Sequence, residues 1–264
     1  MPCTLSVITP VFNGIRFIEF CIRNVIEQNC PDVEHIIVDG GSSDGTVEVI
    51  RRYTAEYPHI RWISEQDRGQ SDAMNKGIGM ASGDILGFLN VDDYYQPGAL
   101  RDALGMFEKL PEPTLLVGNC NVWDDDDKLQ FVNRPAKVGL LALLMLYVPA
   151  FPANPSGYFY HKSLHGKIGL YDVEEHYGMD VHFIFKAVQA AHVKYVDKLW
   201  GNYRYLVDTK TYRDVESGRN RIRVTEIAEF YRKQAPVHYR LFSTFFISCV
   251  KVYKRFLKAI VFRN

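Results

Sequence analysis

Two groups of adjacent carboxylates could hold a divalent cation. One is the pair Asp92 and Asp93 in "GFLNVDDYYQPGAL" (87–100), where an apolar run typical of a buried strand leads into the two side chains. The other is "DDDD" at 124–127. Carboxylate oxygens are the ligands that Mg²⁺ and Mn²⁺ favour, often together with the oxygens of a diphosphate. Both groups carry suitable atoms, so their positions in the fold must decide between them.

The first 125 residues alternate between patterns typical of strands and of helices. Strands are expected at 5–12, 34–41, 60–65, 84–90 and 114–123, and helices at 15–26, 42–57, 71–81 and 97–110. This alternation indicates a mostly parallel sheet that helices cover on both faces. After about residue 130 the pattern loosens, and one further helix is expected at 180–191.

Ligands of open α/β sheets bind beyond the carboxyl ends of the strands. Polar or flexible residues stand at four of these ends, in "TPVFNG", "VDGGSSDG", "SEQDRGQSD" and "LNVDDYY". Asp92 and Asp93 follow the fourth strand directly. A cation site is favoured there over a helix cap, because the next helix is expected to start only near Pro97. "DDDD" lies between a strand and the expected return strand "KLQFV", and an exposed turn is expected there.

The sequence lacks the signature motifs of several common classes of binding and catalytic site. No GxGxxG follows the first strand, and the chain has neither a Walker lysine motif nor a GxSxG elbow. The five cysteines are scattered and form no CxxC pair, which favours a reducing, cytoplasmic setting over a disulfide framework. We expect no signal peptide. The longest apolar run, 138–151, is too short to span a bilayer and is expected in the core.

Charge divides the chain into two unequal parts. Residues 1–229 contain 31 acidic and 23 basic side chains, a net charge of −8, whereas residues 230–264 contain eight basic side chains and no acidic one. A strongly amphipathic helix is expected near the C-terminus. Its apolar side would carry Phe242, Phe245, Phe246, Cys249, Tyr253, Phe256, Leu257 and Ile260, and its other side Lys251, Lys254, Arg255 and Lys258.

Two interpretations of this tail remain open. Residues 240–264 could lie in a membrane interface on its cytoplasmic face, with the lysines near anionic headgroups. They could instead pack on the rest of the chain or on a neighbouring subunit. The acidic body does not indicate a nucleic-acid-binding protein, and the oligomeric state is not predicted.

Five segments carry a resemblance to a known family. "SVITPVFNG", "IIVDGGSSDGT", "DRGQSDAMNKGI", "GDILGFLNVDDYYQPGAL" and "YGMDVHFIFK" occur in an order and at spacings that resemble the inverting family 2 glycosyltransferases. The resemblance covers roughly residues 4–210. It implies a GT-A-type, Rossmann-like mixed sheet, mostly parallel and flanked by helices, with a C-terminal helical extension. Residues 1–225 would form the catalytic domain (1–95 for the nucleotide sugar, 96–225 for the acceptor), and 226–264 the basic tail.

The resemblance also implies a nucleotide-sugar donor and the residues that bind it. The positions that would hold the nucleoside are Thr9, Pro10, Val11 and Asp39. Further nucleotide contacts would come from Asp67 and Arg68, with Asp72 and Asn75 near the donor. Gly40 stands where many members have a second aspartate, so one base or ribose contact would be absent.

The family's DxD-type motif corresponds to Asn90-Val91-Asp92. Asp92 would bind Mn²⁺ or Mg²⁺, and Asn90 would contact ribose or water. Asn90→Asp would then tighten metal binding without being required for it. Arg204 could pair with the donor phosphates.

Asp180 corresponds to the family's catalytic base, with Met179 in place of the usual glutamate. The chemistry requires such a group, because an acceptor hydroxyl that attacks an anomeric carbon must lose its proton to a nearby carboxylate. The alternative for Asp180 is a helix N-cap, and the two roles are compatible.

The function expected from the resemblance is metal-dependent, inverting transfer of a hexose, from a UDP-sugar, to a glycan or lipid-linked glycan acceptor in surface-polysaccharide biosynthesis. Two alternatives belong to other classes. One is a catalytically inactive nucleotide-sugar-binding module, suggested by Asn90, Gly40 and Met179. The other is a nucleotidyltransferase, although the glycine-rich basic loop expected after its first strand is missing.

Overall fold

The computed structural model describes residues 4–207 and 209–261, without the side chains of Lys251 and residues 254–261. Its strands are β1 (Leu5–Val11), β2 (Val33–Asp39), β3 (Ile60–Ser64), β4 (Ile85–Phe88), β5 (Tyr94–Tyr95), β6 (Thr114–Trp123), β7 (Leu129–Asn133), β8 (Tyr158–His161) and β9 (His192–Arg204). Its α-helices are α1 (Ile18–Glu27), α2 (Thr46–Glu56), α3 (Gln70–Met80), α4 (Ala99–Phe107), α5 (Leu140–Leu144), α6 (Leu164–Ile168), α7 (Met179–Ala190), α8 (Lys210–Glu216), α9 (Arg219–Gln234) and α10 (Val237–Val261), and 3-10 turns lie at Val148–Ala150 and Pro155–Gly157.

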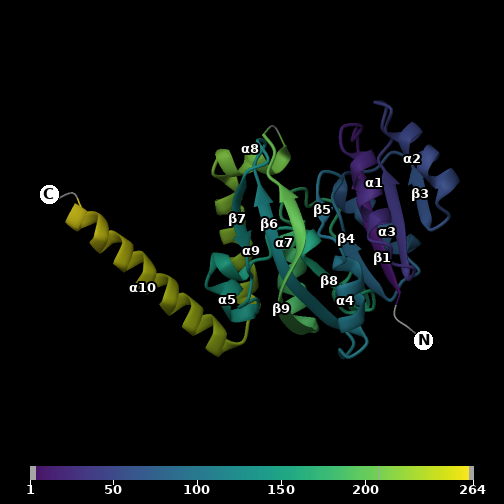
Figure 1. Cartoon of the computed structure of the whole chain (residues 1–264). Coiled ribbons are helices and arrows are strands. Elements are labelled where there is room, and N and C mark those ends of the chain that lie inside the picture. The colour runs from purple at the N-terminus through teal and green to yellow at the C-terminus, as the bar shows by residue number, and fades with distance from the viewer. Residues whose placement is uncertain (1–3, 208, 262–264) are drawn as a thin grey trace.

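The strands of the described chain form one mixed sheet in the order β3-β2-β1-β4-β8-β6-β9-β5, and β7 pairs with β6 outside this path (Figure 1). Strands β1 to β4 run parallel to one another, as do β6 and β9, whereas β8 is antiparallel to both β4 and β6. The carboxyl ends of β1 to β4 therefore meet at one edge of the sheet.

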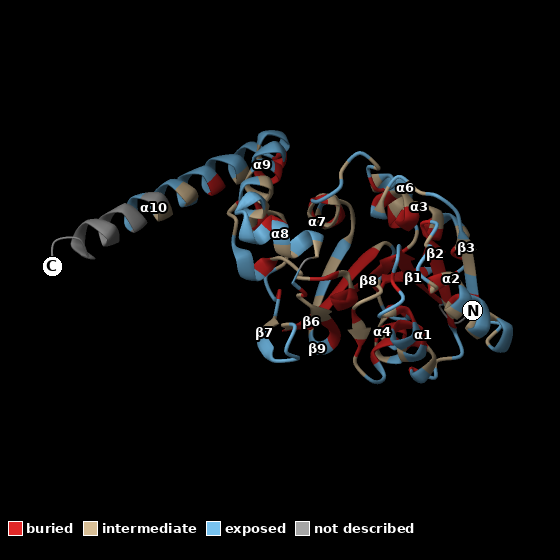
Figure 2. Ribbon diagram, turned by 90° about the horizontal axis from the view of Figure 1, so that it is seen from above, coloured by how far each residue is buried: buried red, intermediate tan, exposed pale blue. Residues whose placement is uncertain are grey.

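Helices cover both faces of the sheet, as the alternating pattern predicts. On β1, Ile8 packs in a cluster with residues of α3 and α7, whereas its neighbour Val7 packs in another with residues of α1 and α4. Successive residues of a strand point to opposite faces, so a strand that is apolar at nearly every position must be buried on both sides. Figure 2 shows the central strands β1, β2 and β8 buried, whereas β3 and β7 are more exposed. The predicted fold class is confirmed.

The six strands and six helices expected from the sequence, including the return strand after 124–127 and the C-terminal helix, are all present, with their ends shifted by a few residues. Strand β5, at the end of residues 1–95, and strands β8 and β9 of residues 96–225 were not predicted. Part of the apolar run at 138–151 lies in the core as predicted, since Leu143, Leu144 and Ala150 are fully buried, whereas Val148 is exposed. No helix within the described residues is long and apolar enough to cross a membrane.

Helix α9 runs across position 225/226, where the sequence divides the chain into domain and tail. Its Ile227, Ala228 and Tyr231 are buried in the core, and Arg232 donates a hydrogen bond to the Leu144 carbonyl at 2.7 Å. By its packing α9 belongs with the catalytic domain. The segment that extends from the body is α10 (Figure 1).

Candidate functional site

The loops that follow β1 and β2 hold each other at the carboxyl edge of the sheet. The Asn13 amide accepts a hydrogen bond from the Ser43 backbone N–H at 3.0 Å, and the backbone N–H of Ile15 donates to Asp44 at 3.0 Å. The Gly14 backbone N–H donates to the Thr46 hydroxyl at 2.9 Å. Two of the four predicted strand ends are thus joined into one rigid rim.

Asp39 ends β2 beneath this rim and is fully buried. Its Oδ2 accepts hydrogen bonds from the backbone N–H groups of Gly41 and Ser42, both at 3.0 Å, and from the Ser64 hydroxyl at 2.7 Å. Its Oδ1 has no partner among the described residues. A buried oxygen without a hydrogen bond is costly unless a ligand supplies a donor, so Asp39 is poised to accept one.

Gly40 brings the loop after β3 close to Asp39. A Cβ atom at position 40 would lie 2.5 Å from Oδ2 of Asp67, so no larger residue fits while Asp67 keeps its place. Asp67 is held by the Gly69 backbone N–H, which donates to Oδ1 at 2.8 Å. Gly40 has no side chain where the family resemblance would place a second aspartate. The carboxylate of Asp67 can therefore occupy that space.

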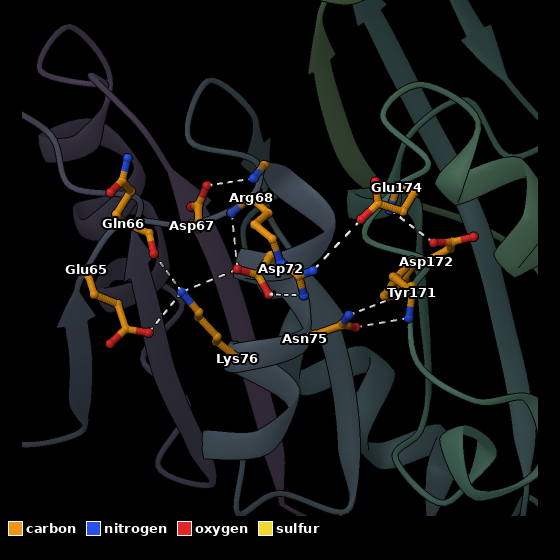
Figure 3. Close-up of polar contacts among 11 residues, drawn as sticks. Glu65, Gln66, Asp67, Arg68, Asp72, Asn75, Lys76, Tyr171, Asp172 and Glu174 are labelled. Carbon is orange, nitrogen blue, oxygen red and sulfur yellow. Dashed lines mark hydrogen bonds and ion pairs between the residues drawn. The ribbon is translucent and has the colours of Figure 1, made fainter.

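The segment from Glu65 to Lys76 forms a polar network at the start of α3 (Figure 3). The Arg68 backbone N–H donates to Asp72 at 3.2 Å, and Lys76 lies 3.4 Å from Asp72 and 2.9 Å from Glu65. The hydrogen bond from the Arg68 backbone and the charge of Lys76 lower the pKa of Asp72. The exposed Arg68 guanidinium reaches Glu174 at 3.8 Å, so this network connects the two halves of the domain.

Asn75 also joins the two halves, by a pair of hydrogen bonds. Its amide nitrogen donates to the Tyr171 carbonyl at 2.8 Å, and its amide oxygen accepts from the Tyr171 backbone N–H at 2.9 Å (Figure 3). This contact uses one hydrogen of the amide nitrogen and one lone pair of the amide oxygen, and it fixes the loop before α7. The donor contact expected for Asn75 stays a prediction.

Thr9, Pro10 and Val11 are buried within β1. The Thr9 hydroxyl is hydrogen-bonded to Nε2 of His35 at 2.9 Å, and Val11 packs in an apolar cluster beside α1 and α2. Burial lowers the pKa of His35 to about 3, so this pair is neutral. The side chains of Thr9 and Val11 thus pack within the fold, and the nucleoside contacts expected at Thr9, Pro10 and Val11 stay predictions.

Asp93 is a fully buried carboxylate that organises the second part of the site. Its oxygens accept hydrogen bonds from the amides of Asn154 at 2.7 Å and Asn90 at 2.9 Å, and from the Arg204 backbone N–H at 3.0 Å. Burial and the adjacent charge of Asp92 raise the pKa of Asp93 well above its usual range, against these three donors. Nothing in the sequence connects Asn154 to Asp93, and its role was not predicted.

Asn90 donates a hydrogen bond to Asp93, and this contact changes the role that the sequence predicts for it. Its amide nitrogen is needed by Asp93, while its amide oxygen accepts a hydrogen bond from Gln70 at 3.0 Å. An aspartate at position 90 would lose the donor and place a second carboxylate against Asp93. These contacts give Asn90→Asp an expected cost in stability, and its effect on metal binding stays a prediction.

Asp92 is the carboxylate that remains available at this edge. Among the described residues, the only hydrogen bond to its side chain comes from its own backbone N–H. Burial raises the pKa of Asp92, and the charge of Arg204 offsets part of that rise. The Arg204 guanidinium contacts two adjacent aromatic rings, at 4.8 Å from the centroid of Phe20 and 5.1 Å from that of Tyr94.

These residues could hold a cation only together with a bound ligand. No cluster of three or more His, Cys, Asp or Glu side chains that could hold a metal occurs in the described part of the chain. One carboxylate, Asp92, offers free oxygen atoms at the sheet edge. Hard cations are commonly held by one or two carboxylates together with substrate phosphates, so the donor set suits a cation that a bound diphosphate helps to hold.

Asp180 lies in the first turn of α7 and is partly buried. The N-cap of α7 is Gly178, whose N–H and that of Tyr177 donate to the Glu175 carboxylate at 2.8 and 2.9 Å, so Asp180 is not the cap. Its Oδ1 accepts from the Val181 backbone N–H at 2.8 Å. Burial raises the pKa of Asp180, which brings a carboxylate closer to the range useful for a general base.

A group of cations next to Asp180 was not predicted. Tyr177 lies between Lys210 and Arg223, each with its charged atom 4.3 Å from the ring centroid. Burial lowers the pKa of Lys210, and the charge of Asp180 partly opposes this shift. The sequence marks Lys210 only by its place in "NYRYLVDTKTY", shortly after Arg204.

The run "DDDD" forms the predicted turn between β6 and β7. The Asp127 backbone N–H donates to the Asp124 carbonyl at 3.1 Å, and residues 125–128 are exposed. Asp125 accepts a hydrogen bond from the Val207 backbone N–H at 2.6 Å. This contact joins the exposed turn to the chain just after β9.

Comparison with known proteins gives one family. The family model "Glycosyl transferase family 2" matches residues 6–164. Among curated relatives, the uncharacterized glycosyltransferase MT1564 of Mycobacterium tuberculosis is 33% identical over 194 residues, which are 70% of this chain and 68% of that protein. Several other curated relatives match over a shorter region, which spans only 11% to 33% of their own length.

Solved structures share the fold at low sequence identity. S. aureus TarS (1–349) in complex with UDP-GlcNAc has a TM-score of 0.64 and 19% identity over 79% of this chain and 60% of that chain. The mannosyltransferase PcManGT of Pyrobaculum calidifontis in complex with GDP-Man and Mn²⁺ has a TM-score of 0.59 and 20% identity over 83% of this chain and 61% of that chain.

Proposed function

Because the chain belongs to glycosyl transferase family 2, we propose that it transfers a sugar from a nucleotide-sugar donor, a UDP-hexose, to an acceptor hydroxyl with inversion at the anomeric carbon. The observation that carries this proposal is that two carboxylates are suited to different roles. The buried Oδ1 of Asp39 has no partner among the described residues, and the pKa of Asp180 is raised. The first suits the N–H of a nucleobase, and the second suits the proton of an attacking hydroxyl.

The residues divide the work between the two ends of the donor. Asp39 and Asp67 would hold the nucleoside beneath the rim of loops, and the Arg204 guanidinium would pair with the diphosphate. Asp180 would take the proton of the acceptor hydroxyl as the hydroxyl attacks. One base on one side of the sugar and a departing diphosphate on the other lead to a single displacement with inversion.

Asp92 would hold a divalent cation, Mn²⁺ or Mg²⁺, together with the donor phosphates. When bound, such a cation neutralises charge that grows on the leaving diphosphate. A solved structural neighbour contains GDP-Man and Mn²⁺, which supports this assignment for the fold. Asn90 and Asp93 would not bind the cation, because they are bonded to each other and to Asn154 and Arg204.

The acceptor that we infer is a glycan or a lipid-linked glycan in surface-polysaccharide assembly, and the location is the cytoplasmic face of a membrane. The described cysteines are all free, which suits a reducing compartment. A lipid-linked acceptor would also explain a basic C-terminal segment on an acidic body.

The test uses purified full-length protein, a panel of UDP-, GDP- and dTDP-sugars, and a lipid extract of the source cells as acceptor. We expect release of free UDP with one UDP-sugar, and a loss of about 100-fold or more in Asp180→Asn. Glu174→Gln, in the same loop region but exposed, is the matched control and should retain activity.

Binding measured by thermal shift separates the alternatives. Asp180→Asn should keep the stabilisation by UDP, because Asp39 is unchanged. Stabilisation of the wild type without any UDP release would favour the inactive binding module, and release of pyrophosphate would favour a nucleotidyltransferase. Full activity of Asp180→Asn would contradict the role of this residue as the base.

A further inference from the structure

Helix α10 leaves the body of the protein after a short contact. It follows Pro236, and near its start it packs against α5 and α9, where Tyr239 lies against the core and Ser243 is fully buried. Beyond this point the helix extends away from the catalytic domain (Figures 1 and 2). Its 25 residues would span about 37 Å at 1.5 Å per residue.

The projecting part of α10 carries an exposed apolar face. We call this face the α10 apolar face, and its members recur at helical spacing: Leu241, Phe242, Phe245, Phe246, Val252 and Tyr253, with 37% to 69% of each side chain exposed. A shallow apolar groove runs between Phe245 and Tyr253 on the same helix. Apolar surface of this extent on the exposed side of a helix marks an interaction site.

Charge indicates which partner this face fits. Residues 230–264 carry eight basic side chains and no acidic one, on a chain whose first 229 residues have a net charge of −8. In the sequence, Lys251, Lys254 and Lys258 recur at helical spacing within this basic segment. Their side chains lie outside the described residues.

A second copy of the helix is a weaker candidate than a membrane for the partner that covers the α10 apolar face. Two α10 helices paired through their apolar faces would be flanked by basic residues only, and no acid within the helix could compensate them. An anionic lipid surface satisfies both features, since aromatic side chains enter the acyl boundary while lysines remain at the headgroups.

We propose that α10 binds an anionic membrane surface through the α10 apolar face and holds the catalytic domain there. This inference goes beyond the proposed transfer reaction and does not rest on it. It also has a consequence for substrate choice: an acceptor that is itself lipid-linked would be confined to the same surface as the enzyme.

The experiment is sedimentation of the full chain with vesicles of phosphatidylcholine containing about 30% phosphatidylglycerol, compared with phosphatidylcholine alone. We expect binding to the anionic vesicles, at least about tenfold weaker binding to the neutral ones, and a decrease when salt rises from about 0.1 M to about 0.5 M. Phe242→Glu/Phe245→Glu should bind at least about tenfold more weakly.

Matched controls distinguish binding through the α10 apolar face from nonspecific adsorption to the vesicles. Phe131 on β7 is 55% exposed, so Phe131→Glu makes the same change on the body and should bind as the wild type does. Lys254→Glu should weaken binding to anionic vesicles more than Lys194→Glu, a reversal at an exposed position of β9. The melting temperature of each variant shows whether it is folded.

Three outcomes would overturn the proposal. Absence of vesicle binding by the folded wild type is one, and equal losses from Phe131→Glu and Phe242→Glu/Phe245→Glu are another. The third is a dimer in solution that Phe245→Glu dissociates while vesicle binding is absent, which would assign the face to a second copy. None of these results depends on UDP release, so the proposed transfer reaction is tested independently of membrane binding.

Discussion

The carboxylates of Asp92–Asp93 and those of 124–127 are the same chemical group in opposite environments. Asp93 is fully buried and accepts hydrogen bonds from nearby Asn90 and from the distant Asn154 and Arg204, and Asp92 beside it has a raised pKa. In the turn, Asp126 is exposed and pairs with Lys128 at 3.4 Å, two residues away. Distant segments organise the first group, whereas the contacts of the turn are mostly local, apart from the hydrogen bond that Asp125 accepts from Val207.

This difference shows that the number of carboxylates is a poor guide to a site. Four adjacent charges are tolerated at 124–127 because water solvates them. Two adjacent carboxylates at a buried sheet edge persist only with compensation, and Asn90, Asn154 and the Arg204 backbone provide it for Asp93. The compensation leaves Asp92 as the carboxylate that can serve a ligand.

The largest effect is expected from Asp92→Asn. Loss of the single available carboxylate at the edge should decrease UDP release by about 100-fold or more, because one amide cannot hold the cation that neutralises the leaving group. Asp126→Asn makes the same change in the turn and should leave the rate within about twofold of the wild type. Equal rates for both variants would remove the basis for distinguishing the clusters.

Asp93→Ala should mainly affect stability. It leaves the amides of Asn90 and Asn154 and the Arg204 N–H without their acceptor, and we expect the free energy of unfolding to fall by about 3 kcal/mol. Urea denaturation measures this change. For Asp126→Ala we expect a change within about 0.5 kcal/mol, and a similar decrease in both variants would contradict the role of Asp93.

The smallest effect concerns Asn90→Asp and depends on pH. Two carboxylates in contact raise each other's pKa, so the folded variant binds a proton more tightly than the unfolded chain does. Its stability deficit against the wild type, about 1–3 kcal/mol near pH 7, should therefore shrink as pH falls toward about 5. A deficit that grows with acidification would contradict this expectation, and tighter Mn²⁺ binding at pH 7 would confirm the one drawn from the sequence.

Much of the donor half follows from local patterns. Apolar runs ending in polar loops predict β1 to β4, and the carboxyl ends of parallel strands meet at one edge in any such sheet. Asp39 and Asp92 therefore lie where the sequence places them. The turn at 124–127 is equally local, because the Asp124 carbonyl accepts from a residue three positions later.

The acceptor half was less predictable because its elements depend on distant partners. Strand β9 pairs in parallel with β6, and its residues carry no alternating pattern of their own. Some side chains of residues 1–95 depend on distant partners as well. The Asn75 amide is hydrogen-bonded to the Tyr171 backbone, 96 residues away, and the Thr9 hydroxyl is hydrogen-bonded to His35.

The sequence by itself determined the fold class, the edge of the sheet that forms the site, and the segregation of basic charge into the last 35 residues, because strand periodicity, turn chemistry and charge are local properties. Tertiary structure decided which polar atoms are occupied. Hydrogen bonds to distant segments engage Asn75 and Asp93, whereas Oδ1 of Asp39 has no partner among the described residues. These contacts depend on which loops meet in space, and one chain's residue pattern does not contain that information.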